Sequence, residues 1–482
     1  MYLGLDVGTS SVKALLIDDD GAVIGTTASP LSLSTPRPGW AEQDPADWLE
    51  AVETALVKMR TQVGTAFDAI KGIGLSGQMH GATILDDEGV PLVPSILWND
   101  TRSAEEAADL DANPVFRRIT GNMVFPGFTA PKLVWLERHF PELFARVNLV
   151  VLPKDYVRLW LTGEAITDMS DASGTSWLDV GGRHWSAELL DETNLTIGQM
   201  PTLVEGTEQA GRIRSDIAQK LGLPPGIPIA GGAGDNAASA CGLGVIDAGD
   251  AFVSIGTSGV LFAATDEFAP NVEKAVHAFC HSLPGRWHQM GVMLSAAGSL
   301  DWLANLVGQT PSQLVGGLGS ELRPPSIVKF LPYLSGERTP HNDAAVRGAF
   351  TGLSRDTSTT DLTQAVLEGV AFALRDNRAA LFGDGAVPER LTAVGGGAKS
   401  QYWVELIATV LGIPVAVPVD GDHGAALGAA RLGLIASTNT DPTAVCIALE
   451  TADNLDPRTD LAPAFSDAYA NWRQLYPSIV EH

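Results

Sequence analysis

Residues 2–18 read YLGLDVGTSSVKALLID, and a similar stretch, AFVSIGTSGVLFAA, occurs at residues 251–264. In each stretch a short apolar segment leads into Gly-Thr-Ser and then into a second apolar segment, and the two glycines lie 248 residues apart. Apolar segments joined by small turn-forming residues are typical of antiparallel hairpins. After the turn at 18–21, residues 23–27 extend the first hairpin to three strands. The sequence therefore predicts the same structure in each half of the chain.

A second pair of similar segments follows the hairpins in the same order. Residues 227–230 (IPIA) lead to Gly234-Asp235, and residues 413–416 (IPVA) lead to Gly421-Asp422, 187 residues later. Two repeats in one order indicate a duplicated domain. We expect the halves to be residues 1–245 and 246–482.

The first half carries 61 more residues between its two motifs than the second half does. We expect this insertion within about residues 98–185, which are rich in Trp, Arg, Asp and Pro. An insertion on one side of a duplicated core is where substrate selectivity is added.

Predicted strands alternate with predicted helices, which indicates an α/β fold. A helix over 456–476 is expected to close the chain, with its aromatic residues packed on the core. The other predicted helices are Pro45–Val63, Thr129–Arg138, Asn236–Leu243, Ser358–Ala379, Tyr402–Leu411 and Ala425–Ile435.

The composition excludes several classes of protein. The chain has 45% hydrophobic residues and a formal net charge of −26. Such an acidic protein is not expected to bind nucleic acid or an anionic membrane surface. No apolar run reaches the roughly 18 residues of a membrane span, and the N-terminus lacks the pattern of a signal peptide. The 3 cysteines are far apart, as in reduced thiols, and we expect a cytoplasmic protein.

The two Gly-Thr-Ser turns are candidate phosphate-binding loops. Successive backbone N–H groups in such a turn can bind an anion. Gly8, Thr9 and Ser10, with Lys13, would bind one part of a polyphosphate, and Gly256, Thr257 and Ser258 another. One such turn alone is more often an ordinary hairpin, but its repetition favours two loops around one nucleotide. Neither loop matches the P-loop or the dinucleotide-binding pattern.

A glycine-rich segment, Gly395-Gly396-Gly397, follows an apolar strand and precedes a helix. Three glycines allow a flat ligand to lie on the backbone, and the helix N-terminus adds donors. We interpret it as a platform for adenosine; a tight turn between strand and helix is the alternative.

Two aspartates beside glycines, Asp6 and Asp235, end predicted strands. Carboxylates there suit Mg²⁺, usually bound through water. They also suit the acceptance of a proton from an attacking hydroxyl, as phosphoryl transfer requires. A helix cap is the alternative role for Asp235 and the expected role for Asp422.

Met79 and His80 follow Gly77-Gln78 at the end of a predicted strand. A Gln and a His framed by glycines can hydrogen-bond a polyol. The alternative is a histidine with a structural role only.

These residues together resemble the FGGY family of carbohydrate kinases, over essentially the whole chain. Asp6-Val7-Gly8-Thr9-Ser10 is similar to the family's first phosphate motif, and GFTAPKLVWLERH (127–139) and GAFTGLSRDTSTTDLTQAVLE (348–368) are similar to its two signatures. Segments that resemble the branch acting on D-xylulose are 77–81, 96–102, 152–156, 168–173, 234–237 and 331–341.

The resemblance implies a duplicated ribonuclease-H-like (actin-like ATPase) fold, with an N-terminal sugar-binding domain and a C-terminal nucleotide-binding domain around a catalytic cleft. It implies phosphorylation of D-xylulose to D-xylulose 5-phosphate with ATP and Mg²⁺. Asp235 would be the general base, with Asp6 at the Mg²⁺–ATP site. Residues implied to contact the ketose are Met79, His80, Asp235 and Asn236, and those implied to lie near ATP are Thr257, Gly397 and Gln401.

Members of the family that act on glycerol carry Arg-Glu at the positions of Met79 and His80, and Tyr at that of Gly127. Smaller and uncharged residues leave room for a five-carbon sugar. Ala297 and Asp301 depart from the glycerol kinases, which carry Gly and Gln there.

Other functions remain open at this point. A kinase of the same family acting on ribulose, gluconate or glycerol would share everything except the region of Met79 and the insertion. The same fold also occurs in chaperone ATPases and filament-forming nucleotide switches. Closure of the two domains is expected to exclude water, and assembly as a homodimer is left open.

Overall fold

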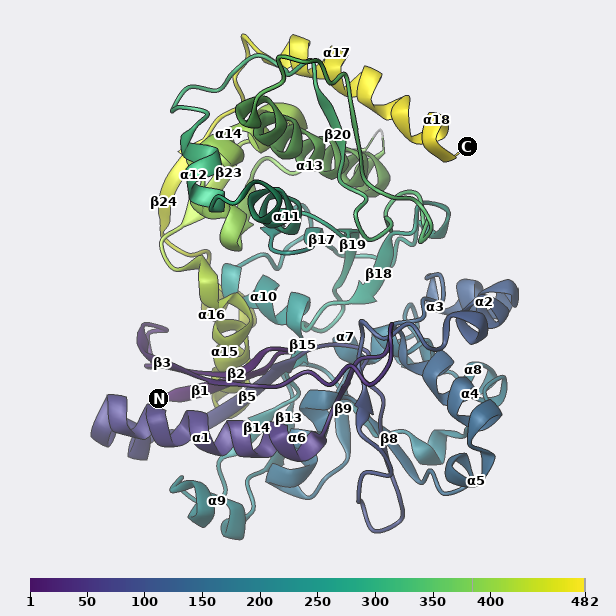
Figure 1. The fold of residues 1–482 in the computed structure, drawn as a ribbon. Helices are drawn as coiled ribbons and strands as arrows, with labels where there is room; N and C mark the ends of the chain where they lie inside the picture. Colours follow the sequence, from purple (N-terminus) through teal and green to yellow (C-terminus); the bar gives the residue numbers. More distant parts are fainter. Residues whose placement is uncertain (384, 481–482) are drawn as a thin grey trace.

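The two hairpins predicted from the sequence form the centres of two seven-stranded sheets. The computed structural model describes residues 1–383 and 385–480. Strand β1 (Tyr2–Val7) pairs antiparallel with β2 (Ser11–Ile17), and β16 (Ala251–Ile255) pairs antiparallel with β17 (Gly259–Thr265). Each hairpin belongs to a separate lobe, the N-terminal lobe below and the C-terminal lobe above in Figure 1.

The two sheets share one topology. The first has the order β13-β14-β5-β1-β2-β3, with β15 also pairing with β5, and the second has the order β18-β19-β17-β16-β22-β23-β24. In both, the hairpin is extended on one side by antiparallel strands, β3 in the first sheet and β19 and β18 in the second. On the other side it is extended by two parallel strands and an antiparallel edge strand. The predicted duplication of a ribonuclease-H-like domain is therefore confirmed. The remaining strands of the sheets are β3 (Val23–Pro30), β5 (Gly72–Gly77), β13 (Gln209–Arg212), β14 (Pro228–Ala230), β15 (Ala233–Gly234), β18 (His277–Cys280), β19 (Trp287–Met293), β22 (Leu391–Val394), β23 (Val415–Pro418) and β24 (Thr451–Leu455).

All six internal helices predicted from the sequence are present, with ends that differ by a few residues. The first is capped by Asp44, whose side chain accepts a hydrogen bond from the Ala46 N–H, and it ends at Gly64 with φ 58°. These helices are α1 (Pro45–Val63), α4 (Thr129–His139), α10 (Asp235–Leu243), α13 (Thr359–Phe382), α14 (Gln401–Leu411) and α15 (Gly424–Thr438).

The helix predicted over 456–476 is shorter than expected. Residues before 456 pair with β23 as strand β24, and helix α17 begins only at Ala462, with Pro463 in its first turn. Proline is favoured there because the first helical residues need no N–H donor. The predicted aromatic face is correct, since Phe465, Tyr469 and Trp472 are buried in the core of the C-terminal lobe.

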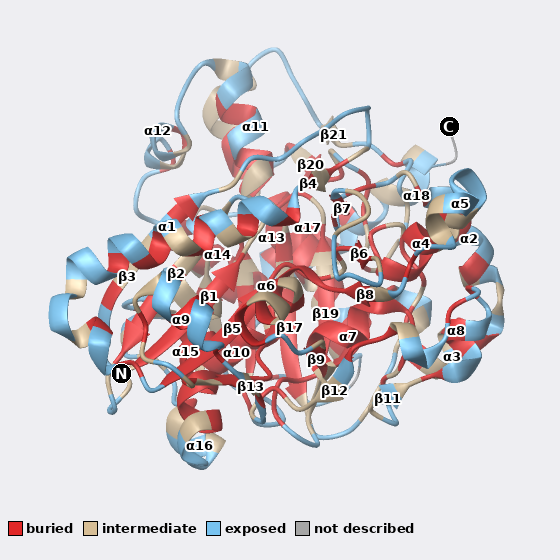
Figure 2. Ribbon diagram, turned by 90° about the horizontal axis from the view of Figure 1, so that it is seen from below, coloured by how far each residue is buried: buried red, intermediate tan, exposed pale blue. Residues whose placement is uncertain are grey.

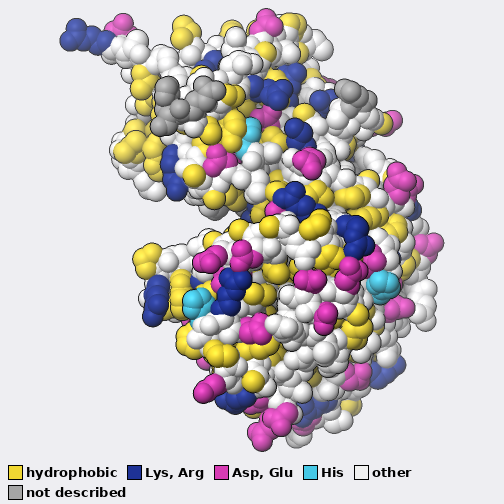
Figure 3. Space-filling model, turned by 90° about the vertical axis from the view of Figure 1, so that its right-hand side faces the viewer, with side chains coloured by type: hydrophobic (Ala, Val, Ile, Leu, Met, Phe, Trp, Pro, Cys, Tyr) yellow, Lys and Arg dark blue, Asp and Glu magenta, His cyan; other side chains and the backbone are white. Residues whose placement is uncertain are grey.

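Helix α15 belongs to the second half of the chain but packs on the sheet of the first half, against β1 and β5, and also on α10. Glycines, which have no side chain, permit this contact. A Cβ atom at Gly4 would lie 2.0 Å from the Ala426 carbonyl oxygen, and one at Gly74 would lie 1.8 Å from that of Ala429. The lobes therefore meet along closely packed backbone, and the surface is hollowed where they adjoin (Figure 3).

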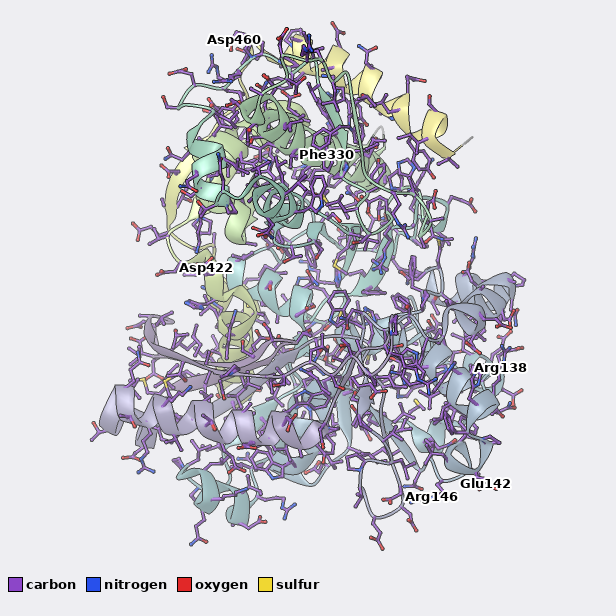
Figure 4. All side chains as sticks on the ribbon, in the orientation of Figure 1. Arg138, Glu142, Arg146, Phe330, Asp422 and Asp460 are labelled. Atoms are coloured by element: carbon purple, nitrogen blue, oxygen red, sulfur yellow. The ribbon has the colours of Figure 1, made fainter. Side chains whose placement is uncertain are left out.

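The region predicted as an insertion forms a subdomain of the N-terminal lobe with a hydrophobic core of its own, around Trp135 and Trp177. Arg138, Glu142 and Arg146 lie on its outer edge (Figure 4). Its bounds stay a prediction. Its elements are α2 (Ala104–Ala112), α3 (Pro114–Thr120), α4, α5 (Pro141–Phe144), β8 (Leu149–Val151), α6 (Pro153–Thr162), β9 (Ile166–Asp168), α7 (Met169–Ala172), β10 (Leu178–Asp179) and β11 (His184–Trp185).

Buried residues are concentrated in the two sheets and in the helices between the lobes, whereas α5 and α12 are largely exposed (Figure 2). In the described part of the chain, no helix is long and apolar enough to cross a membrane. The other elements are β4 (Glu42–Gln43), β6 (Thr83–Leu85), β7 (Ser95–Ile96), α8 (Ala187–Asp191), β12 (Thr202–Val204), α9 (Ser215–Leu221), α11 (Ala297–Val307), α12 (Pro311–Gly316), β20 (Lys329–Leu331), β21 (Ala349–Thr351), α16 (Pro442–Val445) and α18 (Leu475–Val480).

Candidate active site

A cavity of about 300 Å³ lies between the two lobes and brings together four of the predicted site residues. Asp6 and Lys13 reach it from the first hairpin, and Asp235 and Asn236 from the start of α10. The C-terminal lobe contributes Ser254 of β16 and Gly395 of the glycine-rich loop. The cavity therefore contains residues from both copies of the duplicated domain.

Asp235 is the first residue of α10, directly after strand β15. Its Oδ1 accepts hydrogen bonds from the Asn236 backbone N–H at 2.7 Å and from Asn236 Nδ2 at 2.9 Å. Burial, followed by the charge of Asp6, raises the pKa of Asp235 to about 6. At neutral pH the group is a carboxylate that can accept a proton, as a general base requires.

Asp6 lies near the end of β1 and is 8% exposed. It accepts a hydrogen bond from Ser76 Oγ at 3.2 Å. Lys13 is its partner in the antiparallel register. Burial raises the pKa of Asp6, and the charge of Lys13 opposes that effect. Among the ion pairs of the described residues none includes Lys13, so its ammonium group remains available to a phosphate.

The donor set of the cavity suits Mg²⁺ shared with a nucleotide. Asp6 and Asp235 supply hard carboxylate oxygens. Outside position 384 and the last two residues, no group of three or more His, Cys, Asp or Glu side chains forms a self-contained metal site. Mg²⁺ is commonly held by one or two carboxylates together with substrate phosphates and water. The residues present therefore fit that ion.

A second cavity, of about 610 Å³, adjoins the glycine-rich loop in the C-terminal lobe. Gly396, Gly397 and Gln401 line it, together with Asp301 of α11. Gly395, one residue earlier, lines the first cavity. The loop that was predicted to support adenosine thus separates the two cavities, so that one extended ligand can occupy both.

The loop lies close to the end of β16. Gly395 has φ 90°, and a Cβ atom there would lie 2.9 Å from the Ile255 carbonyl oxygen. The segment leads into a 3₁₀ turn, Gly396–Lys399, before α14 begins at Gln401 with Ser400 as its cap. Gln401 Nε2 donates to Asp453 Oδ2 at 3.1 Å.

The structure places the two Gly-Thr-Ser turns beside the cavities but not in their linings. Gly8, Thr9 and Ser10 follow β1; Thr9 Oγ1 donates to Gln78 Oε1 at 3.0 Å and accepts from Trp98 Nε1 at 3.0 Å. Phosphate binding by this turn stays a prediction.

The corresponding turn of the C-terminal lobe, Gly256-Thr257-Ser258, supports α11. The carbonyl of Gly256 accepts from the Ala297 N–H at 2.7 Å, and that of Thr257 accepts from the Ala296 N–H at 2.8 Å. Because α11 lines the second cavity, this turn sets the position of that wall.

Met79 and His80 lie beside the segment that carries Asp235. A Cβ atom at Gly234 would be 2.8 Å from the Met79 side chain. His80 has φ 70°, stacks on Phe128 with ring centroids 4.6 Å apart, and bonds through Nδ1 to the Gly174 carbonyl at 2.7 Å.

The bond to a carbonyl fixes the tautomer of His80. Only a protonated Nδ1 can donate to the carbonyl oxygen, and burial lowers the pKa of His80 to about 3. The imidazole is therefore neutral, with Nε2 as an acceptor. Such an acceptor suits a sugar hydroxyl.

The prediction that Asp422 caps a helix is wrong. Asp422 lies in a 3₁₀ turn, Gly421–His423, and the cap position of α15 belongs to His423. Asp422 lines the first cavity and pairs with Lys399, at 2.8 Å, which lines the second. It lies at the edge of the C-terminal lobe that faces the N-terminal lobe (Figure 4).

Other residues that line the first cavity had no predicted role. The repeat around Asp422 was the one signal that pointed to the segment it belongs to. These residues are Ser239, Leu243, Ser254, Val394, His423, Gly424, Ala425 and Ala426.

Comparisons with known proteins agree with this geometry. The N-terminal domain of the FGGY family of carbohydrate kinases matches residues 1–242, and the C-terminal domain matches residues 251–437. The xylulose kinase of Escherichia coli (strain K12) is 47% identical over 439 residues, which cover 91% of this chain and 90% of that protein.

Solved structures extend the similarity to the whole chain. A structure described as a xyloylose kinase from Brucella ovis is 58% identical, with a TM-score of 0.97 and coverage of 100% of this chain and 99% of the other. The gluconate kinase from Lactobacillus acidophilus is 25% identical, with a TM-score of 0.92 and coverage of 99% and 97%. This chain therefore belongs to the FGGY family of carbohydrate kinases, enzymes that phosphorylate sugars with ATP.

Proposed function

We propose that this enzyme transfers the γ-phosphoryl group of ATP to the terminal hydroxyl of D-xylulose and so forms D-xylulose 5-phosphate. The observation that carries the proposal is the position of Asp235, in a cavity between two lobes of a carbohydrate kinase and directly after Gly234, which packs against Met79. The names of the relatives support the choice of sugar, since the xylulose kinase of E. coli is similar over nine-tenths of its length.

The chemistry follows from the free oxygen of Asp235. Its Oδ1 is occupied by Asn236, whereas Oδ2 takes part in none of the hydrogen bonds between described residues. Asp235 Oδ2 accepts the proton of the sugar hydroxyl as the oxygen bonds to the γ-phosphorus and the bond to the β-phosphate oxygen breaks. ADP leaves with that electron pair. Positioning and electrostatics provide most of the catalysis in this reaction class.

The charges around the cavity would balance those of the nucleotide. Lys13 faces the phosphates as a point charge. Mg²⁺, held by Asp6 and Asp235 together with the phosphates, would stabilise the negative charge on the transferring group. The adenosine would lie in the second cavity against Gly396 and Gly397, with the phosphates passing over the loop into the first.

The sugar would be held by the neutral imidazole of His80. Its Nε2 would accept a hydrogen bond from a sugar hydroxyl, and the amide of Asn236 offers a donor next to the base. Closure of the lobes, a cytoplasmic location and a homodimer remain predictions.

The fold alone does not select the sugar, because the gluconate kinase has the same fold with a TM-score of 0.92. The decisive experiment is ADP release measured with D-xylulose, D-ribulose, L-ribulose, gluconate and glycerol under one set of conditions. We expect the highest kcat/KM with D-xylulose. A higher value for any of the others would contradict the proposed substrate, and ATP hydrolysis that no sugar stimulates would contradict a kinase role.

A further inference from the structure

A group of five charged side chains lies buried next to residues 230–234, the segment that leads into Asp235. We call it the Lys154 cluster; its members are Lys154, Asp155, Arg158, Asp168 and Asp171, each of them 0% exposed. The Lys154 ammonium nitrogen lies 2.6 Å from Asp155 Oδ1, 2.8 Å from Asp168 Oδ1 and 3.1 Å from Asp171 Oδ2. Burying so many charges contributes little to stability, because desolvation offsets the attraction between them.

The charges of the cluster face one another. Burial raises the pKa of Asp171 well above its ordinary value; the charge of Lys154 opposes this effect, whereas Asp155 and Asp168 add to it. Two cations, Lys154 and Arg158, contact the acidic side chains of the cluster. The charged groups are therefore engaged with one another.

Arg158 connects the cluster to the backbone just before Asp235. Arg158 donates to the carbonyl of Ala230 and to that of Gly231, each at 2.5 Å. These residues lie between β14 and β15, where Gly232 turns the chain with φ 76°. The guanidinium group thus fixes the direction of the backbone that enters the site.

Asp168 and Ser170 connect the cluster to Gly234, the residue adjacent to Asp235. Asp168 Oδ2 accepts from the Ser170 N–H at 2.8 Å and from Ser170 Oγ at 2.5 Å. Ser170 Oγ in turn accepts from the Gly234 N–H at 3.1 Å. Because the hydroxyl proton is directed to the carboxylate, the lone pairs of the oxygen face Gly234.

We propose that the Lys154 cluster positions the catalytic carboxylate of Asp235. Lys154 forms an ion pair with Asp168, and Asp168 accepts hydrogen bonds from Ser170. Ser170 in turn accepts a hydrogen bond from the backbone N–H of Gly234. Arg158 donates to the two carbonyl groups upstream. None of these side chains lines the cavity, so they act through Asp235 and not on the substrate. A displacement of about 1 Å at a reacting group can cost about 100-fold in rate. The inference rests on the proposed role of Asp235 as the base.

Ser170→Ala is the test, because it removes the link to Gly234 and leaves every charge in place. We expect kcat with D-xylulose to fall about 10-fold to 100-fold, while the KM values for the sugar and ATP stay within about twofold because binding groups are untouched. Ser170→Thr restores the hydroxyl and should restore most of kcat. Ser186→Ala is the matched control: it removes another buried hydroxyl that accepts one backbone N–H, that of Leu189.

Circular dichroism and Tm accompany each variant, so that a loss of folding is separated from a loss of rate. A kcat of Ser170→Ala equal to the wild type, or a loss no greater than that of Ser186→Ala, would overturn the inference. So would a rise in both KM values with kcat unchanged.

Asp235→Asn separates this inference from the proposed function. If Ser170 acts through Asp235, then Ser170→Ala in the Asp235→Asn background lowers the residual rate no further. Independent, additive losses would overturn the positioning role and leave the base in place. Near-normal turnover by Asp235→Asn alone would overturn the base assignment, and with it this inference.

Discussion

Asp6 and Asp235 lie at distant positions in the N-terminal half of the chain, yet both line one cavity, and the charge of Asp6 helps to raise the pKa of Asp235. The pairing of strands explains their proximity. Strand β5 lies between β1 and β15 and is parallel to both. The carboxyl ends of parallel strands meet at one edge of a sheet, where α/β proteins bind their ligands. Two isolated motifs in the sequence therefore become one site.

The first prediction concerns the dependence of activity on pH. The pKa of Asp235 is about 6, and below it the carboxyl group holds a proton and cannot accept that of the sugar. We expect kcat/KM for D-xylulose to be flat above pH 6 and to fall about tenfold per pH unit below it. A flat profile down to pH 4.5 would contradict a base with a raised pKa.

Asp6→Asn tests the cause of that pKa shift. It removes the negative charge next to Asp235, so the pKa of Asp235 should move down toward its ordinary value. Titration of the carboxyl carbons by NMR, without nucleotide, measures this shift independently of activity. Asp20→Asn, in the exposed turn between β2 and β3, is the control and should leave the pKa of Asp235 unchanged.

Replacement of the base itself should separate chemistry from binding. In Asp235→Ala we expect kcat to fall about 10²-fold to 10⁴-fold, the range that general-base catalysis contributes. ATP should still bind, because Gly396, Gly397 and Gln401 lie in the other cavity. Coupled ADP release and isothermal titration with ATP measure the two effects. Turnover close to that of the wild type would show that another group accepts the proton.

The fourth prediction concerns His80, whose neutral state follows from burial, whereas its bond to the Gly174 carbonyl fixes the tautomer. Because its pKa is about 3, His80 does not titrate between pH 5 and 8, and KM for the ketose should not follow the titration of an ordinary histidine near pH 6.5. His80→Phe keeps a ring against Phe128 but removes the acceptor. It should raise the sugar KM about 2-fold to 13-fold, the value of one hydrogen bond to a neutral group.

KM for ATP is the control in the same variant, since His80 lies outside the lining of the second cavity. An equal rise in both KM values would indicate a general disturbance of the lobe. An unchanged sugar KM would show that His80 does not contact the ketose.

Local patterns in the sequence were sufficient to predict the hairpins, the duplication and most of the longer helices. Strands β1 and β16 each place their apolar residues next to the same Gly-Thr-Ser turn, and such signals do not depend on the rest of the chain. Asp6, Lys13, Asp235 and Asn236 line one cavity, and the pattern could single them out because they stand close to the ends of strands or helices that it defines. Their roles stay predictions.

Long-range packing could not be predicted in the same way. Nothing in residues 424–438 shows that α15 packs on β1 of the other half, because the signal is an absence of side chains at positions such as Gly4 and Gly74. Asp422 was assigned as a cap from its repeat, but a 3₁₀ turn precedes α15. The link from Lys154 to Gly234 depends on residues that only the tertiary structure brings together.

The contact of α10 with α15 leads to the last prediction. Gly428 of α15 lies so close to α10 that a Cβ atom there would be 1.8 Å from the Ala238 carbonyl oxygen. Backbone atoms cannot yield as a flexible side chain does, so Gly428→Ala should force the helices apart. We expect a loss of about 1–3 kcal/mol in the free energy of unfolding, the usual range for overpacking. Gly198→Ala, where the nearest atom to the added carbon is Thr196 Oγ1 at an ordinary 3.7 Å, is the control and should be close to neutral. Because α10 begins with Asp235, Gly428→Ala should also lower kcat, whereas Gly198→Ala should not. Urea denaturation and ADP release measure both effects, and a Gly428→Ala variant as stable as the wild type would show that the lobes can separate without cost.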